Sequence, residues 1–136
     1  MWPFFNRIFH KLQFIRKGMV DVMKEMIIII RPEKLETVKR IIDEAGVGGI
    51  SISSVMGCGT QRGMENGQEA SEIKTKINLL PKIRVEIVIR DDKVEEIITE
   101  IREYVATGHV GDGKIFVRNI EDAVRIRTSE RGNRAL

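Results

Sequence analysis

The chain contains very few of the residues that form disulfides or metal sites. Its 136 residues include one cysteine, Cys58, and two histidines, His10 and His109. A single cysteine excludes an intramolecular disulfide and is typical of a protein in a reducing compartment, so we expect a cytoplasmic location. The spacing of these three residues also fits no structural zinc site. Cys58 is expected to be a buried free thiol without a catalytic partner.

The chain also lacks the charge pattern of a nucleic-acid-binding protein and the long apolar run of a membrane protein. It carries 23 basic and 20 acidic residues, a net charge of +3, and from Lys24 onward the two signs are interspersed. A nucleic-acid site would concentrate basic residues, usually with aromatics, on one face. No run reaches the roughly 18 apolar residues that span a bilayer. The sequence therefore predicts neither direct nucleic-acid binding nor stable membrane insertion.

Residues 1–22 differ in composition from the rest of the chain. Apolar residues recur there at helical spacing and basic residues fill much of the opposite face, at Phe5, Ile8, Phe9, Leu12 and Ile15 and at Arg7, His10, Lys11, Arg16 and Lys17 respectively. Basic amphipathic helices of this kind lie on membrane surfaces. Met19 and Met23 are alternative start residues, however, and a leader from a misassigned start would look the same, which is the interpretation we favour. We expect residues 23–136 to form one domain.

From residue 23 onward, strand-like and helix-like patterns alternate. Apolar runs or alternation predict strands at residues 26–30, 50–55, 79–90 and 115–117. Apolar stripes predict one helix that begins near Pro32 and ends before Gly46, and a second that is capped by Asp91 and Asp92 and runs to Val105. A helical turn at 120–124 and a short extended piece at 125–128 are predicted after the last strand.

The order β-α-β-β-α-β is that of the α+β ferredoxin-like unit, one antiparallel sheet with both helices on one face. The second face of such a sheet must also be covered. Because the predicted strands are apolar on both sides, we expect another copy of the chain to cover it.

Two parts of the sequence suit anion binding. In residues 108–114, glycines allow backbone N–H groups to converge on an anion, and Lys114 adds a positive charge, although a tight hairpin turn fits this spacing equally well. Arg125 and Arg127 alternate, so in an extended segment both guanidinium groups would share a face and suit phosphate. The alternative for these arginines is a solvated edge strand.

The polar segment at 57–78 is long for a compact domain, and such loops are usually functional or disordered. Gln61 and Arg62 follow the second predicted strand, and Lys82 lies where the chain re-enters the sheet. A carboxylate or phosphate bound among these side chains is physically reasonable, but each residue is equally ordinary on an exposed loop.

Four segments together resemble the PII nitrogen-regulatory proteins. Residues 107–117, TGHVGDGKIFV, resemble the signature of that family, and residues 29–35 (IIRPEKL), 80–83 (LPKI) and 124–132 (VRIRTSERG) are similar to its other motifs. They occur in the order and at about the spacing of the family. The resemblance covers roughly residues 24–136.

The resemblance implies a homotrimer of ferredoxin-like subunits that is a sensor rather than an enzyme. Its effectors would be ATP or ADP, 2-oxoglutarate and Mg²⁺, bound between subunits. The nucleotide-binding residues would be Ile29, Gly57, Gly59, Glu86, Val88, Val110, Gly111, Asp112, Gly113 and Lys114, with Arg125 and Arg127 from the neighbouring subunit. The 2-oxoglutarate-binding residues would be Gln61, Arg62, Gly63, Lys82 and Gly111, with Gln61 also helping to hold Mg²⁺.

The resemblance also implies that a T-loop, at about residues 59–78, engages target proteins. Such targets are an ammonium transporter, which would bring the protein to the membrane, glutamine synthetase, nitrogenase or a transcription regulator. The only tyrosine, Tyr104, lies outside this loop, so modification of a loop tyrosine is excluded, and Ser71 or Thr75 would be the loop's phosphorylation candidates. Thr60 stands where the family commonly has a basic residue, which puts ATP/ADP discrimination in question.

Two other functions stay open at the sequence level. A PII-like trimer that binds other ligands, such as bicarbonate or a cyclic nucleotide, would share the fold. A weak ATPase would use Lys114, Arg125 and Arg127 near the phosphates, but no residue is evident that would activate water.

Overall fold

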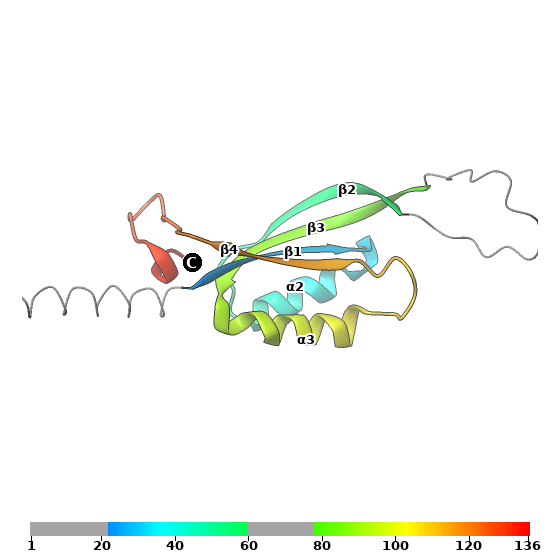
Figure 1. Cartoon of the computed structure of the whole chain (residues 1–136), viewed down its shortest axis with the longest axis horizontal. Helices are drawn as coiled ribbons and strands as arrows, with labels where there is room; N and C mark the ends of the chain where they lie inside the picture. Colours follow the sequence, from blue (N-terminus) through cyan, green and yellow to red (C-terminus); the bar gives the residue numbers. More distant parts are fainter. Residues whose placement is uncertain (1–21, 60–77) are drawn as a thin grey trace, which may run out of the picture.

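The computed structural model describes residues 22–59 and 78–136, and the amphipathic helix expected within residues 1–22 lies outside them except for Val22. The elements are β1 (Met23–Ile30), α2 (Leu35–Glu44), β2 (Ser51–Gly59), β3 (Asn78–Arg90), α3 (Val94–Val105) and β4 (Lys114–Ile120). The strands form one antiparallel sheet in the order β2-β3-β1-β4. Both helices lie on the same face of this sheet (Figure 1). The predicted ferredoxin-like α+β fold is confirmed.

The core lies between the sheet and the two helices. Alternate residues of β1 and β3 and the apolar stripes of α2 and α3 are buried there: Met26, Ile28, Ile30, Val38, Ile41, Ile42, Val85, Ile87, Ile89, Val94, Ile97, Ile101 and Val105. Full burial of one such side chain contributes about 1.5–3 kcal/mol of transfer free energy. The helical and strand periodicity of the sequence thus predicted the core correctly.

The strands are longer than their apolar patterns indicated. β2 continues through Gly57 and Cys58 because these residues stay paired with Leu80 and Leu79 of β3. β4 continues to Ile120 because it pairs with residues 23–29 of β1, up to the Met23–Ile120 pair. The predicted helical turn at 120–124 is therefore wrong, since Ile120 belongs to the strand.

The predicted capping role of Asp91 and Asp92 is also wrong. Both residues lie in a short 3-10 turn, Asp91–Lys93, ahead of α3, and no side chain caps that helix. The Asp92 carboxylate instead accepts a hydrogen bond from the Arg90 guanidinium at 2.5 Å. Asp91 lies 3.6 Å from the ammonium group of Lys24 on β1.

The segment 125–128 is not extended. The N–H of Arg125 donates to the carbonyl of Glu130 at 2.9 Å, and the N–H of Ser129 donates back to the carbonyl of Arg125 at 2.8 Å. Ser129 closes this turn with φ +60°, and Val124 pairs with Arg131 across it. The prediction that alternation places Arg125 and Arg127 on one strand face is therefore wrong.

The face of the sheet away from the helices is mixed in character. Ile27 of β1 pairs with Glu86 of β3 on one side and with Phe116 of β4 on the other, so the three side chains share this face. Phe116 is 53% exposed. Ion pairs flank the apolar centre, Arg84 with Glu86 at 2.7 Å and Arg118 with Glu25. None of the helices in the described ranges is long and apolar enough to cross a membrane.

Candidate functional site

The loop between α3 and β4 is shaped by three glycines. Gly108, Gly111 and Gly113 have φ values of +80°, +100° and +106°, which side chains rarely adopt. A Cβ at Gly113 would lie 1.7 Å from the carbonyl oxygen of Ile29. The loop therefore packs its backbone directly against the end of β1.

Asp112 holds the loop from within. Its carboxylate accepts hydrogen bonds from the hydroxyl and the N–H of Thr107, at 2.5 and 2.7 Å, and from the N–H of Gly108 at 2.9 Å. These bonds, led by that from the Thr107 hydroxyl, hold the pKa of Asp112 below its usual range, although burial acts in the opposite direction. The carboxylate thus faces its own loop and organises it.

Two cations from the sheet hold the other side of the loop. The Arg31 guanidinium donates to the carbonyl of Val110 at 2.7 Å and to that of Gly111 at 3.2 Å. The ammonium group of Lys82 donates to the same Gly111 carbonyl at 2.5 Å. Both cations are bound to backbone oxygens in this state.

The loop encloses a cleft of about 650 Å³ together with the ends of β2 and β3 that lie nearest the segment connecting them. It is lined by the predicted residues Ile29, Gly57, Lys82, Val110, Gly111, Gly113 and Lys114, and by Arg31, Glu33, Cys58, Leu80 and Phe116. The side chain of Lys114 makes no hydrogen bond or ion pair within the described ranges, whereas its backbone pairs with Ile29. Three cations against one carboxylate give this first cleft a positive character, which suits a polyanion.

Cys58 is exposed, which corrects the expectation of a buried thiol. Its position in the paired end of β2, beside the cleft, removes it from the core. Gly59, the next residue, pairs with Asn78 at the end of the hairpin that the structure describes.

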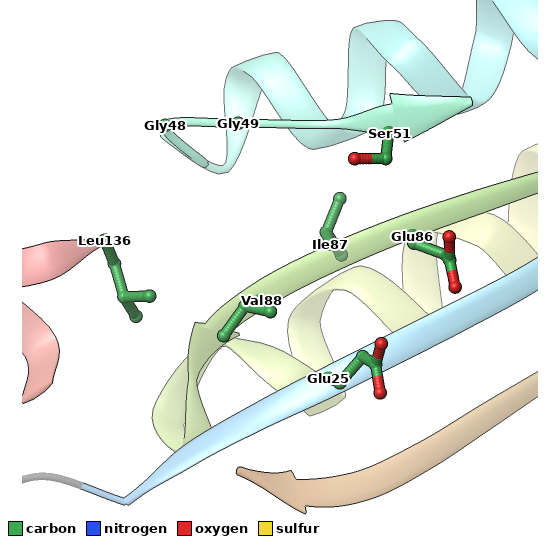
Figure 2. Close-up of a pocket in the computed structure, with 8 residues that line it drawn as sticks. All are labelled: Glu25, Gly48, Gly49, Ser51, Glu86, Ile87, Val88 and Leu136. Carbon is green, nitrogen blue, oxygen red and sulfur yellow. The ribbon is translucent and has the colours of Figure 1, made fainter. Parts of the chain in front are cut away.

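Glu86 and Val88 lie elsewhere, on a second cavity of about 330 Å³ (Figure 2). The other lining residues are Glu25, Gly48, Gly49, Ser51, Ile87 and Leu136. Glu86 projects from β3 and Glu25 from β1, while Leu136 approaches from the C-terminal segment (Figure 2). The predicted nucleotide-binding residues of one subunit thus fall into two separate groups.

Arg125 belongs with the second group. Its guanidinium donates to the carbonyl of Leu136 and to the carboxylate of Glu130, both at 2.9 Å. Arg127 is exposed on the same turn and makes no hydrogen bond or ion pair in the part of the chain that the structure describes. The side chain of Arg125 is therefore fixed by hydrogen bonds, whereas that of Arg127 has no such bond within the described residues.

Several lining residues were not singled out by the sequence. Arg31 lies within a family-like motif but had no predicted role, and its contacts with a loop some 80 positions away have no local signal. Ser51 carried only strand periodicity, and Phe116 lay within the family-like motif of residues 107–117 without a predicted role. Thr60, Gln61, Arg62, Gly63, Ser71 and Thr75 lie outside the described residues.

No group of three or more His, Cys, Asp or Glu side chains that would hold a metal ion occurs within residues 22–59 and 78–136.

Residues 23–130 match the family model described as nitrogen regulatory protein P-II. The chain is 42% identical over 114 residues to nitrogen regulatory protein P-II 2 of Methanothermobacter thermautotrophicus, covering 84% of this chain and 97% of that protein. It is 46% identical over 110 residues to nitrogen regulatory protein P-II of Bradyrhizobium diazoefficiens, covering 81% and 96% respectively.

Solved structures of related proteins have a fold similar to that of this chain. The complex of B. subtilis GlnK with ATP superposes with a TM-score of 0.71 at 32% identity, covering 85% of this chain and 99% of that one. Arabidopsis thaliana PII bound to citrate gives a TM-score of 0.67 at 32% identity, covering 85% and 94%.

Proposed function

The chain belongs to the P-II family of nitrogen regulatory proteins, and we propose that it senses ATP or ADP together with 2-oxoglutarate, without chemistry of its own. The observation that carries the proposal is the first cleft, where a glycine loop meets Arg31, Lys82 and Lys114. Glycine loops expose backbone N–H groups to phosphate, and lysines add point charges.

The ligands of the solved relatives support this choice of ligand class. GlnK was solved with ATP and the Arabidopsis protein with citrate, one a nucleotide triphosphate and the other a small carboxylate. We assign the phosphates to the glycine loop and Lys114, and a carboxylate of 2-oxoglutarate to Lys82. The carboxylate would replace the Gly111 carbonyl as the partner of Lys82, because a charged acceptor is stronger than a neutral one.

The division of the predicted residues into two groups supports assembly. Glu86 and Val88 line a second cavity on the same subunit, apart from the glycine loop, and Arg125 is hydrogen-bonded to Leu136, another lining residue of that cavity. We propose a homotrimer in which the second cavity of one subunit faces the first cleft of its neighbour. Arg125 and Arg127 would then reach the phosphates from the neighbouring subunit.

We further propose that Mg²⁺ links the two ligands. ATP and 2-oxoglutarate are both polyanions and repel each other unless a cation lies between them. Phosphate and carboxylate oxygens, with the amide oxygen of Gln61, form a suitable set of hard ligands for Mg²⁺. Their shared metal would make binding of the two ligands cooperative.

The output would be a change in the T-loop, residues 59–78, that a target protein reads. Candidate targets are an ammonium transporter, glutamine synthetase, nitrogenase or a transcription regulator. Tyr104 lies on α3 and outside residues 59–78 of the sequence, so the proposed signal passes by ligand binding rather than by modification of a loop tyrosine.

Calorimetry tests the sensing proposal directly. 2-Oxoglutarate is titrated into the protein with Mg-ATP, with ADP and with no nucleotide. We expect tight binding only with Mg-ATP, and equal binding in all three states would refute the proposal.

Two loop variants separate the metal bridge from general loop effects. Gln61→Ala should lose 2-oxoglutarate binding while it keeps most of its affinity for ATP. Gln68→Ala, a second glutamine of the same loop, is the matched control and should behave like the parent protein. Normal 2-oxoglutarate binding by Gln61→Ala would contradict the role of Gln61.

A further inference from the structure

Arg31 stands where the rigid sheet meets the glycine loop. It directly follows β1 and precedes Pro32, and its backbone is extended at φ −67° and ψ 145°. A following proline disfavours the helical region for the residue before it, so this backbone geometry is built into the sequence. The N–H of Lys34 also donates to the Arg31 carbonyl at 3.0 Å, which fixes the turn. The half-buried side chain of Arg31 therefore starts from a well-defined point.

The contacts of Arg31 determine how the loop is oriented. Its guanidinium reaches two successive carbonyls, those of Val110 at 2.7 Å and Gly111 at 3.2 Å. Peptide groups are planar and trans, so a carbonyl fixed on one side directs the N–H of the next residue to the other. Holding these two carbonyls therefore sets the directions of the N–H groups of Gly111 and Asp112.

Arginine is suited to this task in a way that lysine is not. The guanidinium is a planar fork with donors in fixed relative positions, whereas an ammonium group is a single point charge. Lys82 illustrates the difference, because it contacts only the Gly111 carbonyl, at 2.5 Å. If a ligand carboxylate replaced the Gly111 carbonyl as the partner of Lys82, Arg31 would still donate hydrogen bonds to the loop carbonyls.

We propose that Arg31 is a positioning residue for phosphate recognition. It orders residues 107–113 before a nucleotide arrives, and it keeps them ordered when Lys82 turns to a carboxylate ligand. The role of Arg31 in nucleotide binding rests on the proposed function, whereas its role in ordering the loop does not. It assigns Arg31 to the loop's backbone rather than to the phosphates themselves.

The test compares Arg31→Ala and Arg31→Lys with the parent protein. Amide hydrogen exchange of residues 107–113 is measured without ligand, and affinities for ATP and for adenosine are measured by calorimetry. We expect exchange to become at least tenfold faster and ATP to bind about tenfold more weakly in both variants. Adenosine, which has no phosphates, should bind within twofold of the parent protein.

Arg40→Ala is the matched control, since Arg40 is an exposed arginine paired with Glu44 at 3.0 Å on α2. It should change neither the exchange of the loop nor the affinity for ATP. Melting temperatures of all variants show whether the fold is kept, and Arg31→Lys preserves the charge in case Arg31→Ala does not fold.

Three results would overturn the inference. Unchanged exchange in both variants would show that Arg31 does not order the loop. Parent-like ATP affinity in Arg31→Lys would show that charge alone matters. An equal loss of adenosine would indicate general damage to the cleft. If the parent protein itself binds no ATP, the proposed function fails, while the exchange measurement still decides whether Arg31 orders the loop.

Discussion

Gly113 shows how a single missing side chain shapes the first cleft. Its φ is +106°, and a Cβ added to it would lie 1.7 Å from the Ile29 oxygen, so no other residue fits without movement of the loop. In Gly113→Ala, a left-handed backbone costs about 1–2 kcal/mol, and displacement of the loop from β1 adds to this. We expect this variant to unfold at lower urea concentration and to lose ATP binding.

Gly108→Ala is the control for the backbone effect alone. Gly108 also has a positive φ, +80°, but nothing lies within 4 Å of its Cβ position. It should be destabilised by only about 1–2 kcal/mol and should keep most of its affinity for ATP. Equal effects of the two substitutions would contradict the close approach of the loop to Ile29.

Asp112 predicts a pH dependence of the same loop. Its folded pKa lies below the unfolded value of about 3.9, so its ionised form stabilises the folded loop. That contribution is present above the unfolded pKa and is lost as the pH falls through the folded pKa. In Thr107→Val the largest cause of the shift is removed, and the pKa of Asp112 should rise towards its usual value.

Carboxyl chemical shifts in an NMR titration measure this directly. Asp122, whose pKa is lowered chiefly by its hydrogen bond from Arg131, is the internal control and should not change in Thr107→Val. A pKa of Asp112 that stays low in the variant would show that the Thr107 hydroxyl is not the main cause.

At the scale of elements, sequence periodicity predicted the buried residues of helices and strands. It did not predict strand ends, which depend on pairing with another strand, or the turn near the C-terminus. Val38, Ile41, Ile97 and Ile101 recur at helical spacing, and all are buried as that spacing requires. Gly57 and Cys58 carry no such signal, because their place in β2 depends on the register with β3. A strand end set by its partner cannot be predicted from the strand's own residues.

The prediction of an extended segment at residues 125–128 was wrong for a different reason. Residues 125–128 alternate basic and other side chains as an edge strand would, but Ser129 turns the chain with φ +60°. A glycine at that position would have indicated a turn, whereas serine gives little warning. The bonds from Arg125 to Glu130 and Leu136 join residues that the periodicity does not relate.

This turn predicts different outcomes for its two arginines. Arg125→Ala removes hydrogen bonds to the Glu130 carboxylate and the Leu136 carbonyl, so it should lower stability by about 1 kcal/mol as well as weaken ATP binding. Arg127→Ala removes no such bond within the described residues, so stability should stay unchanged while ATP binding weakens. Urea unfolding and calorimetry separate the two effects. A loss of stability in Arg127→Ala, or none in Arg125→Ala, would contradict these contacts.

At the scale of the whole molecule, the fold divides the predicted nucleotide-binding residues of one subunit between two cavities. The resemblance assigned Ile29 and Glu86 to one nucleotide site, and the fold puts them on different cavities of one subunit. In the register of β1 with β3, Ile29 pairs with Arg84 and Glu86 pairs with Ile27, a long-range relation that no local pattern carries. In the proposed homotrimer, the second cavity of a neighbouring subunit completes the binding site.

Assembly through the open face of the sheet can therefore be tested with two matched aromatics. Phe116 is 53% exposed on that face, and Tyr104 is 52% exposed on α3, which packs on the opposite face. A carboxylate in place of Phe116 would have to be buried unpaired at the subunit contact, which strongly opposes association. We expect Phe116→Asp to sediment as a smaller species than the parent protein. Its ATP affinity would not report on assembly alone, because Phe116 also lines the first cleft. Tyr104→Asp should keep the parent's sedimentation coefficient and ATP affinity. If Phe116→Asp stays fully assembled while Tyr104→Asp dissociates, the subunits meet through the helices, and the proposed intersubunit site is wrong.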